Sequence, residues 1–143
     1  MIVASILNGK GREVLSVTPD MAVRDAARFL RDKKIGAAVV LDDAGQLVGI
    51  LSERDILNAV AEQGGAALAQ EVSALMTADV HTCQLTTPIG VLMTTMTDRR
   101  IRHLPVIEAD RVVGVVSIGD VVKSRIAEAE AEAEALKTYI ASG

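Results

Sequence analysis

The segment GILSERDI at residues 49–56 returns as GVVSIGDV at residues 114–121. Upstream of these copies, VLSV at 14–17 pairs with VHTC at 80–83. The offset is 65 residues for the first pair and 66 for the second, so one residue has been lost in between. A repeat of this period indicates one supersecondary unit present twice, and roughly sixty residues is near the lower size for an independent core. We therefore expect the two units to pack on each other.

Each unit predicts the same order of elements: strand, helix, strand, strand, helix. In the first unit, a strand at 14–17 precedes a helix at 21–33 with apolar residues at 3.6-residue spacing. The β-branched runs 37–41 and 47–51 flank a turn sequence and predict a hairpin, after which a helix begins at Glu53. Because these strands are continuously apolar, helices should cover the sheets. The second unit predicts a strand at 80–83, a helix at 88–100, strands at 104–107 and 112–116, and a helix from 117 or 118.

The last helix continues past the repeat. Residues 127–135 alternate Ala and Glu, which are both good helix formers. We expect either a solvated helix lying on its own body or a contact with a second copy or a partner. Apolar residues spaced by 4, 3, 4, 3 and 4 form a heptad-like seam along it: Val122, Ile126, Ala129, Ala133, Leu136 and Ile140.

Composition excludes several classes of protein. The chain has 143 residues, 50% apolar and 24% charged, with a net charge of −4. Its apolar content excludes a disordered chain, and no apolar stretch reaches the roughly 18 residues of a membrane span. It lacks the excess of Lys and Arg that a nucleic-acid binder needs. The amino terminus shows no secretory signal and Cys83 is the one cysteine, so we expect a cytoplasmic protein without disulfides.

The sequence shows neither a set of metal ligands nor a catalytic triad. His81, Cys83 and His103 complete no metal-ligand set. Cys83 matches Val17 of the first unit, which favours a small buried hydrophobe. We interpret the basic residues at 99–103 as a solvated helix end or a phosphate contact, in preference to a nucleic-acid interface. Because two histidines and scattered carboxylates offer no triad, we expect a binding module and not an enzyme.

The repeated motif reads Gly-h-h-Ser-x-x-Asp, with h apolar, where a strand enters a helix. The Gly lets the backbone approach a neighbour, and the Ser stands where free N–H groups and the positive helix end favour phosphate. The Asp follows about one turn later on the same side, where it can accept hydrogen bonds from ribose hydroxyls. Alternatively, each Ser and Asp satisfies only the helix end, as a capping box.

With both copies in place, the chain resembles a stand-alone CBS domain pair, also called a Bateman module. The resemblance rests on residues 49–55 and 114–120 and on RIRHLPV at 100–106, and it covers about residues 8–126. It implies an α+β fold in which two βαββα repeats pack in pseudo-twofold fashion through their sheets. The expected domains are CBS repeat 1 at 8–65, CBS repeat 2 at 72–126, and a C-terminal helical extension at 127–143.

The resemblance also implies two clefts for adenosine-type ligands: AMP, ADP, ATP, S-adenosylmethionine, or sometimes NAD or diadenosine compounds. No cofactor is required beyond such a regulatory ligand. In one cleft, Asp120 would hold the ribose and Ser117 the phosphate. The other candidates there are Val80 and Thr82 beside the base, Arg102 and His103 near the phosphates, and Pro105 in the same segment as these two.

In the other cleft, Asp55 and Ser52 would take the same parts. The first copy has Gly-Ala at 36–37 where the second has Arg-His at 102–103. A guanidinium matches phosphate oxygens in bidentate fashion, so we expect the Ser117/Asp120 cleft to be preferred. The remaining candidates in the Asp55 cleft are Ser16, which matches Thr82, and Arg54, an added cation.

The expectation from the whole sequence is a regulatory module. It would sense an adenosine-containing ligand in clefts between its repeats and signal by a conformational or dimer change. Its partners would be the small molecule, a second copy in a homodimer and an unknown effector protein, without membrane or nucleic acid. The alternative is a structural dimeric adaptor whose clefts are unoccupied.

Overall fold

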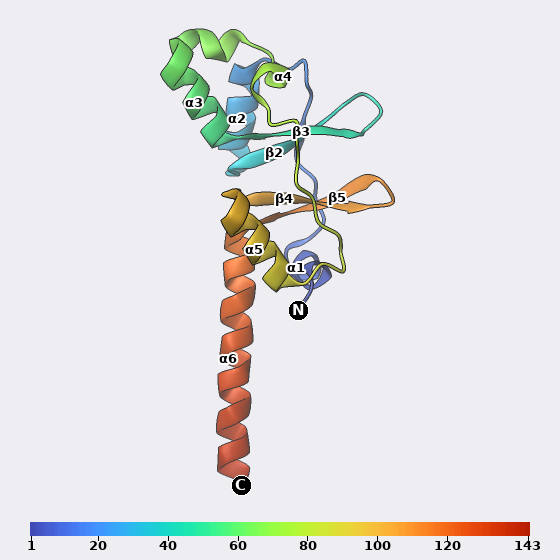
Figure 1. The fold of residues 1–143 in the computed structure, drawn as a ribbon, viewed down its shortest axis with the longest axis vertical. Helices are drawn as coiled ribbons and strands as arrows, with labels where there is room; N and C mark the ends of the chain where they lie inside the picture. The colour runs from blue at the N-terminus through green and yellow to red at the C-terminus, as the bar shows by residue number, and fades with distance from the viewer.

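The computed structural model describes all residues 1–143, and its two halves stack as four layers. Two small sheets lie next to each other in the middle, with α2 and α3 outside one sheet and α1, α5 and α6 outside the other (Figure 1). This is the α+β fold of two βαββα units packed through their sheets that the sequence predicts. The elements are α1 (Val3–Lys10), β1 (Ser16–Val17), α2 (Val23–Lys33), β2 (Ala37–Leu41), β3 (Leu47–Ser52), α3 (Glu53–Gln63), a 3-10 helix (Gly64–Ala69), α4 (Val72–Leu75), α5 (Ile89–Arg99), β4 (His103–Glu108), β5 (Arg111–Ser117) and α6 (Ile118–Ser142).

Both predicted hairpins form, but the first strand of each unit is shorter than expected. β2 pairs in parallel with β1 and antiparallel with β3, while β4 and β5 form an antiparallel pair. The strand predicted at 80–83 is reduced to one bridge between Cys83 and Val106. Cys83 donates its N–H to the Pro105 carbonyl and accepts from the Ile107 N–H, and no other residue of 80–83 pairs with β4. The helix predicted at 21–33 is α2, and it begins two residues later than predicted, at Val23.

The repeat is preserved in the backbone where each first helix ends. Lys34 and Arg100, 66 residues apart, both adopt the left-handed conformation, with φ of 57° and 55°. The following N–H groups, of Ile35 and Ile101, reach back to the carbonyls of Leu30 and Met96. Such a turn satisfies helix-end carbonyls and redirects the chain into the next strand. The residues just before β2 and just before β4 therefore occupy equivalent positions in their two units.

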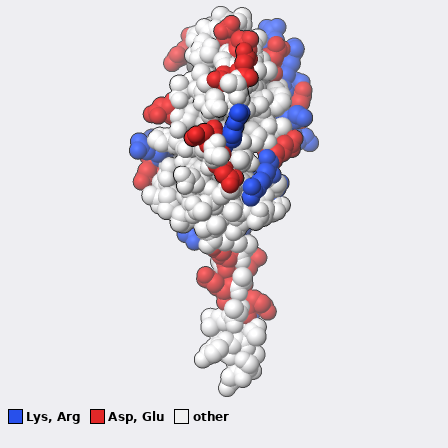
Figure 2. All heavy atoms as spheres, turned by 90° about the vertical axis from the view of Figure 1, so that its right-hand side faces the viewer, with Lys and Arg blue, Asp and Glu red and all other residues white.

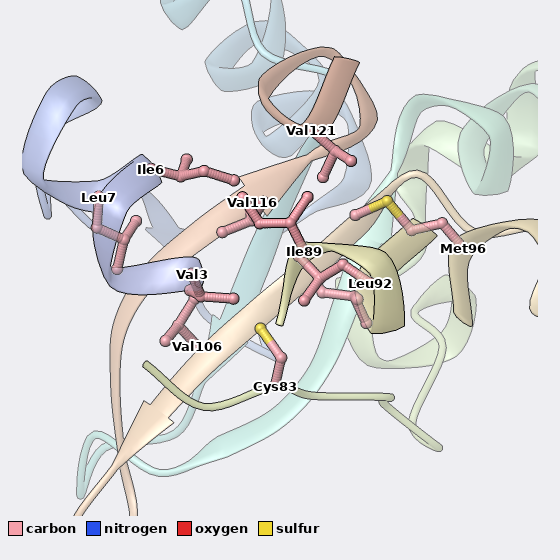
Figure 3. Packing of buried hydrophobic residues seen from close by; sticks show 11 residues of the cluster. Val3, Ile6, Leu7, Cys83, Ile89, Leu92, Met96, Val106, Val116 and Val121 are labelled. Carbon is pink, nitrogen blue, oxygen red and sulfur yellow. The ribbon is translucent and has the colours of Figure 1, made fainter. Parts of the chain in front are cut away.

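The core of each unit is completed by a helix that lies outside the predicted repeat. Val3, Ile6 and Leu7 of α1 pack onto the second unit as members of one buried cluster of 11 residues (Figure 3). Val72 of α4 closes the core of the first unit. The sequence analysis predicts neither helix. The amino-terminal helix therefore belongs to the distant second unit, and the connection between the units belongs to the first.

The two motif glycines are the points where these helices approach the sheets. An added Cβ at Gly114 would lie 2.9 Å from the Leu7 methyl carbons. At Gly49 it would lie 2.6 Å from the Met76 sulfur and 3.0 Å from the Thr77 backbone oxygen. A side-chain end can move aside, whereas a backbone carbonyl in a bridge cannot move without breaking that bridge.

We therefore expect Gly49→Ala to destabilise the protein more than Gly114→Ala. Overpacking of a tight site costs about 1 to 3 kcal/mol, and the Thr77 backbone should place Gly49→Ala at the upper end of this range. Chemical denaturation of both variants measures the difference. Equal losses, or a larger loss at Gly114, would contradict this account of the two contacts.

The second half of α6 leaves the body of the molecule, as Figure 1 shows. Residues 129–142, which we call the stalk, are all exposed. The stalk therefore does not lie on its own body, which was one of the two expectations for it. No helix of the chain has both the length and the apolar character needed to cross a membrane.

Candidate ligand-binding cleft

Both repeated Ser-x-x-Asp pairs close capping boxes at the starts of α3 and α6. Asp55 donates its N–H to Ser52 Oγ at 3.1 Å, and Ser52 donates its N–H to Asp55 Oδ2 at 2.9 Å. Ser117 and Asp120 repeat the pattern at 3.2 and 2.9 Å. Both copies therefore cap their helices. Each capping box uses one carboxylate oxygen and leaves the second oxygen and the serine hydroxyl proton for other contacts.

A cleft of about 870 Å³ opens beside the first of these capping boxes. It lies where the start of α3 faces the segment before β4, so both units contribute to its walls. Such a volume is within the range of sites that hold small organic ligands. Its lining residues are Gly36, Ala37, Ile50, Ser52, Glu53, Arg54, Asp55, Leu57, Thr77, Asp79, Val80, His81, Arg99, Arg100, Ile101, Arg102 and His103.

The charges of the cleft come from opposite units. The first unit brings the Ser52 hydroxyl and the Asp55 carboxylate, both half-buried. The second brings exposed guanidinium groups from the end of α5 and the segment after it. The cleft therefore has acceptors at one wall and bidentate donors at the facing wall. Its cationic side chains are Arg54, Arg99, Arg100 and Arg102, and its carboxylates are Glu53, Asp55 and Asp79.

His103 lies where β2 and β4 begin side by side. A Cβ added to Gly36 would lie 3.3 Å from His103 Cε1, so this position needs a small residue to leave room for the ring. Burial lowers the pKa of His103 below its ordinary value of 6.5, and the nearby Glu53 carboxylate opposes this effect only in part. The imidazole is therefore neutral at pH 7, where it can donate one hydrogen bond and accept another.

The second motif has a different environment, because Lys10 at the end of α1 covers it. Lys10 Nζ donates to Asp120 Oδ2 at 2.7 Å and to the Val115 carbonyl at 2.9 Å. Burial alone would raise the pKa of Asp120, but the hydrogen bonds from Lys10 and from the Ser117 backbone lower it below its ordinary value. Lys10 and the Ser117 N–H both bond Oδ2 of Asp120, so the second motif has an ammonium group beside its carboxylate.

The sequence repeat shows which residues of the first unit are equivalent to Lys10 and to its partner Val115. Lys10 corresponds to Met76 at the 66-residue offset, and Val115 corresponds to Ile50 at the 65-residue offset. In the first unit, Ile50 and Thr77 exchange two backbone hydrogen bonds, both of 2.9 Å. In the second unit, the Lys10 side chain takes the carbonyl of Val115 instead. The two copies therefore differ in chemistry at one equivalent point.

The structure regroups the predicted site residues. Val80, Arg102 and His103 line the same cleft as Ser52, Arg54 and Asp55, whereas the sequence analysis grouped the first three with Asp120. His103 also pairs with Ser117 across β4 and β5, and Ile118 donates its N–H to the Arg102 carbonyl, so these two residues lie next to the second motif as well. Residues 77–81 pass along the first unit, fixed by the bridge between Thr77 and Ile50.

Three further candidates lie outside this cleft. Ser16 pairs with Val39 inside the first sheet, Thr82 is exposed, and Pro105 is buried in β4. The cleft instead includes Ile50, Thr77 and Asp79, which were not predicted. Ile50 sits inside the repeated motif, so its position was visible in the sequence. Nothing in the local sequence marked Thr77 or Asp79, because only the crossing of the chain brings them to the cleft.

Two packed βαββα units with a cleft where they meet define a class of small paired-repeat modules. The family model described as the CBS domain matches residues 10–62 and again 72–127. The chain therefore belongs to the CBS domain family, and it contains two copies of the domain.

Known relatives agree with this assignment. The CBS domain-containing protein CBSX3, mitochondrial, of Arabidopsis thaliana is 36% identical, over 99% of this chain and 72% of its own. The crystal structure of a CBS-domain protein from Agrobacterium tumefaciens is 48% identical, with a TM-score of 0.85, covering 87% of this chain and 92% of that one.

Two solved neighbours are complexes with adenosine compounds. A CBS domain protein from Pyrobaculum aerophilum, complexed with AMP, has a TM-score of 0.75 and 28% identity, over 84% of this chain and 89% of its own. The CBS domain pair of the protein MJ0100, in complex with 5'-methylthioadenosine and S-adenosyl-L-methionine, has a TM-score of 0.80 and 25% identity, over 90% and 98%.

Proposed function

We propose that this protein is a regulatory module whose Ser52/Asp55 cleft binds a phosphorylated adenosine ligand. The observation that carries the proposal is the meeting, in one cleft of about 870 Å³, of a hydroxyl and carboxylate pair with four arginines. The adenosine compounds bound by two neighbouring structures support the same class of ligand.

Each part of a nucleotide has a counterpart in the cleft. The free oxygen of Asp55 can accept hydrogen bonds from the two ribose hydroxyls, while the Ser52 hydroxyl can donate to a phosphate oxygen. The positive end of α3 favours the same phosphate. Apolar side chains of Ala37, Ile50 and Val80 offer surface for the flat face of a base.

The balance of charge favours phosphorylated ligands over S-adenosylmethionine. The cleft has four arginines against three carboxylates, so an anionic ligand completes the charge balance and a sulfonium compound does not. S-adenosylmethionine is therefore the competing ligand that a binding panel has to include. Tight binding of it, with silence toward AMP, ADP and ATP, would contradict the assignment to nucleotides.

The position of the cleft suggests how occupancy becomes a signal. Its ligand would touch α3 of the first unit and the segment before β4 of the second. A ligand that binds one relative placement of the units better than another shifts the population toward that placement. We propose that an effector protein reads this change. A cytoplasmic location, a homodimeric state and the lack of a catalytic role remain predictions of the same account.

We also propose that each chain holds one ligand and not two. The Asp120 carboxylate, which the repeat makes equivalent to Asp55, is already bonded to Lys10 at 2.7 Å. A ligand at the second motif would meet this ammonium group beside Asp120, whereas Asp55 has no side-chain cation bonded to it. The preference we expected from sequence for the Ser117/Asp120 cleft is therefore not part of the proposal.

A thermal-shift panel tests the proposed ligand class. At a hundredfold excess over its Kd, a ligand stabilises the native state by about 2.7 kcal/mol. We expect clear stabilisation by AMP, ADP or ATP, weaker stabilisation by adenosine, and loss of the nucleotide effect in Arg102→Gln. Arg12→Gln, at an exposed residue outside the cleft, is the matched control and should behave as wild type. Silence across the whole panel would favour the structural adaptor instead.

A further inference from the structure

We propose that the stalk is one half of a parallel two-stranded coiled coil, and that its partner is the stalk of a second copy of this chain. The seam begins just before the stalk, at Val122 and Ile126, and continues along it through Ala129, Ala133, Leu136 and Ile140. This surface is separate from the ligand cleft, and the proposal does not depend on what the cleft binds.

The seam is free on the outside of the molecule. The side of α6 that faces the body is marked by buried Val121, by Ser124 against the Met1 sulfur, and by Glu128 against the amino terminus. With 3.6 residues per turn, the seam lies roughly 110° around the helix from that side. Its large side chains are accordingly exposed, Ile126 by 53%, Leu136 by 59% and Ile140 by 68%.

An uncovered stalk of this length needs a partner to be stable. Residues 129–142 extend for about 20 Å without contact to the body, and an isolated helix of this length is marginal in water. Burying a seam of aliphatic side chains against a second helix supplies the missing stabilisation.

The residue types along the seam favour two parallel strands. In heptad terms, Ile126, Ala133 and Ile140 occupy a positions, while Val122, Ala129 and Leu136 occupy d positions. A β-branched residue at a combined with Leu at d favours a parallel dimer, as Ile140 and Leu136 provide here. The two alanines let the helices approach closely in the middle.

The charges beside the seam select the same orientation. In a parallel pair, each g residue faces the e residue five positions later in the partner. Glu132 then faces the partner's Lys137. Arg125 faces the partner's Glu130 in the same way, although within its own chain it already pairs with Glu128 and contacts the Met93 sulfur. An antiparallel pair over the same stretch would instead set Glu130 against its own copy and Glu132 against its own copy. Figure 2 shows acidic side chains standing out along the part of the projecting helix nearest the body.

The first test measures the mass in solution. We expect light scattering coupled to gel filtration to give twice the 15.0 kDa of one chain. Leu136→Glu, at the seam, should weaken this association more than about tenfold, because it buries a charge in the interface. Thr138→Glu, at the exposed f position, adds the same charge and should leave the mass unchanged. A single-chain mass for the wild type, or a dimer that tolerates Leu136→Glu, would overturn the proposal.

The second test addresses orientation through charge. Glu132→Lys alone places like charges opposite each other in the parallel pair and should weaken it severalfold. Adding Lys137→Glu in the same chain restores two opposite pairs and should recover the wild-type dissociation constant. If the double variant forms a weaker dimer than Glu132→Lys alone, the parallel arrangement is wrong.

A third test fixes the register by cross-linking. The native Cys83 is buried, and burial raises its pKa to about 11, so it does not react in this experiment. Ala129→Cys should form a disulfide between copies on mild oxidation, because identical d residues meet in a parallel pair. Ala131→Cys, on the outer face, should not. Equal cross-linking of both variants would contradict the assigned seam.

Discussion

Asp55→Asn is expected to weaken nucleotide binding by about a hundredfold, equivalent to roughly 3 kcal/mol. The substituted amide keeps an oxygen that can accept the Ser52 N–H, so the helix cap survives. It replaces the second carboxylate oxygen by a donor, which cannot accept hydrogen bonds from ribose hydroxyls. Titration calorimetry with the nucleotide that stabilises the protein most measures the effect, and the melting temperature of the unliganded variant checks the fold.

The matched control is Asp120→Asn, which changes the equivalent residue of the second repeat. Since Asp120 is bonded to Lys10 and stands outside the proposed site, this variant should bind the nucleotide with wild-type affinity. The opposite pattern, with binding lost at Asp120→Asn and retained at Asp55→Asn, would show that the ligand uses the second motif.

Lys10→Met is expected to raise the number of nucleotides bound per chain from one to two. Methionine is the residue that the first unit has at the equivalent position, Met76, so the variant makes the two motifs alike. Removing the ammonium group takes the cation away from Asp120, which then resembles Asp55, so that a ribose can approach the carboxylate. The new site should be the weaker one, because the repeat places Lys33 and Lys34 where the first site has Arg99 and Arg100, and lysine lacks the bidentate fork.

Calorimetric stoichiometry measures this change directly. The contact itself is partly exposed, so its loss should cost about 1 kcal/mol of stability or less. Because the folded-state pKa of Asp120 is lowered, the contact stabilises the protein above the ordinary value of 3.8. The stability difference between Lys10→Met and wild type should therefore vanish as the pH falls through the lowered pKa. Two sites in the wild type, or one site in the variant, would contradict the role of Lys10.

Most of the fold follows from the repeat and from local pattern. The hairpin at 37–41 and 47–51 and the long last helix were predicted within a residue or two, because apolar runs and caps are local signals. The helix α1 was missed. Its apolar residues Val3, Ile6 and Leu7 complete a core whose other members begin at Cys83, and only the folded chain shows what they cover.

The sequence names candidates at both motifs, and the structure shows which of them line the one large cleft. The repeat identifies Ser52 and Asp55 as equivalent to Ser117 and Asp120, yet equivalence does not say which copy faces the segment at 99–103. That depends on how the connecting chain crosses between the units, which Thr77 fixes through a backbone bridge. The same limit hid the role of Lys10, whose partner Asp120 lies 110 residues later.

A crystal structure of the protein with its best-binding adenine nucleotide tests the central claim most directly. The account predicts that the ribose hydroxyls contact the Asp55 carboxylate and that the phosphates lie between Ser52 and the arginines of the segment before β4, with Lys10 still bonded to Asp120. A nucleotide bound at Asp120 in place of Lys10, with the Asp55 cleft empty, would contradict it.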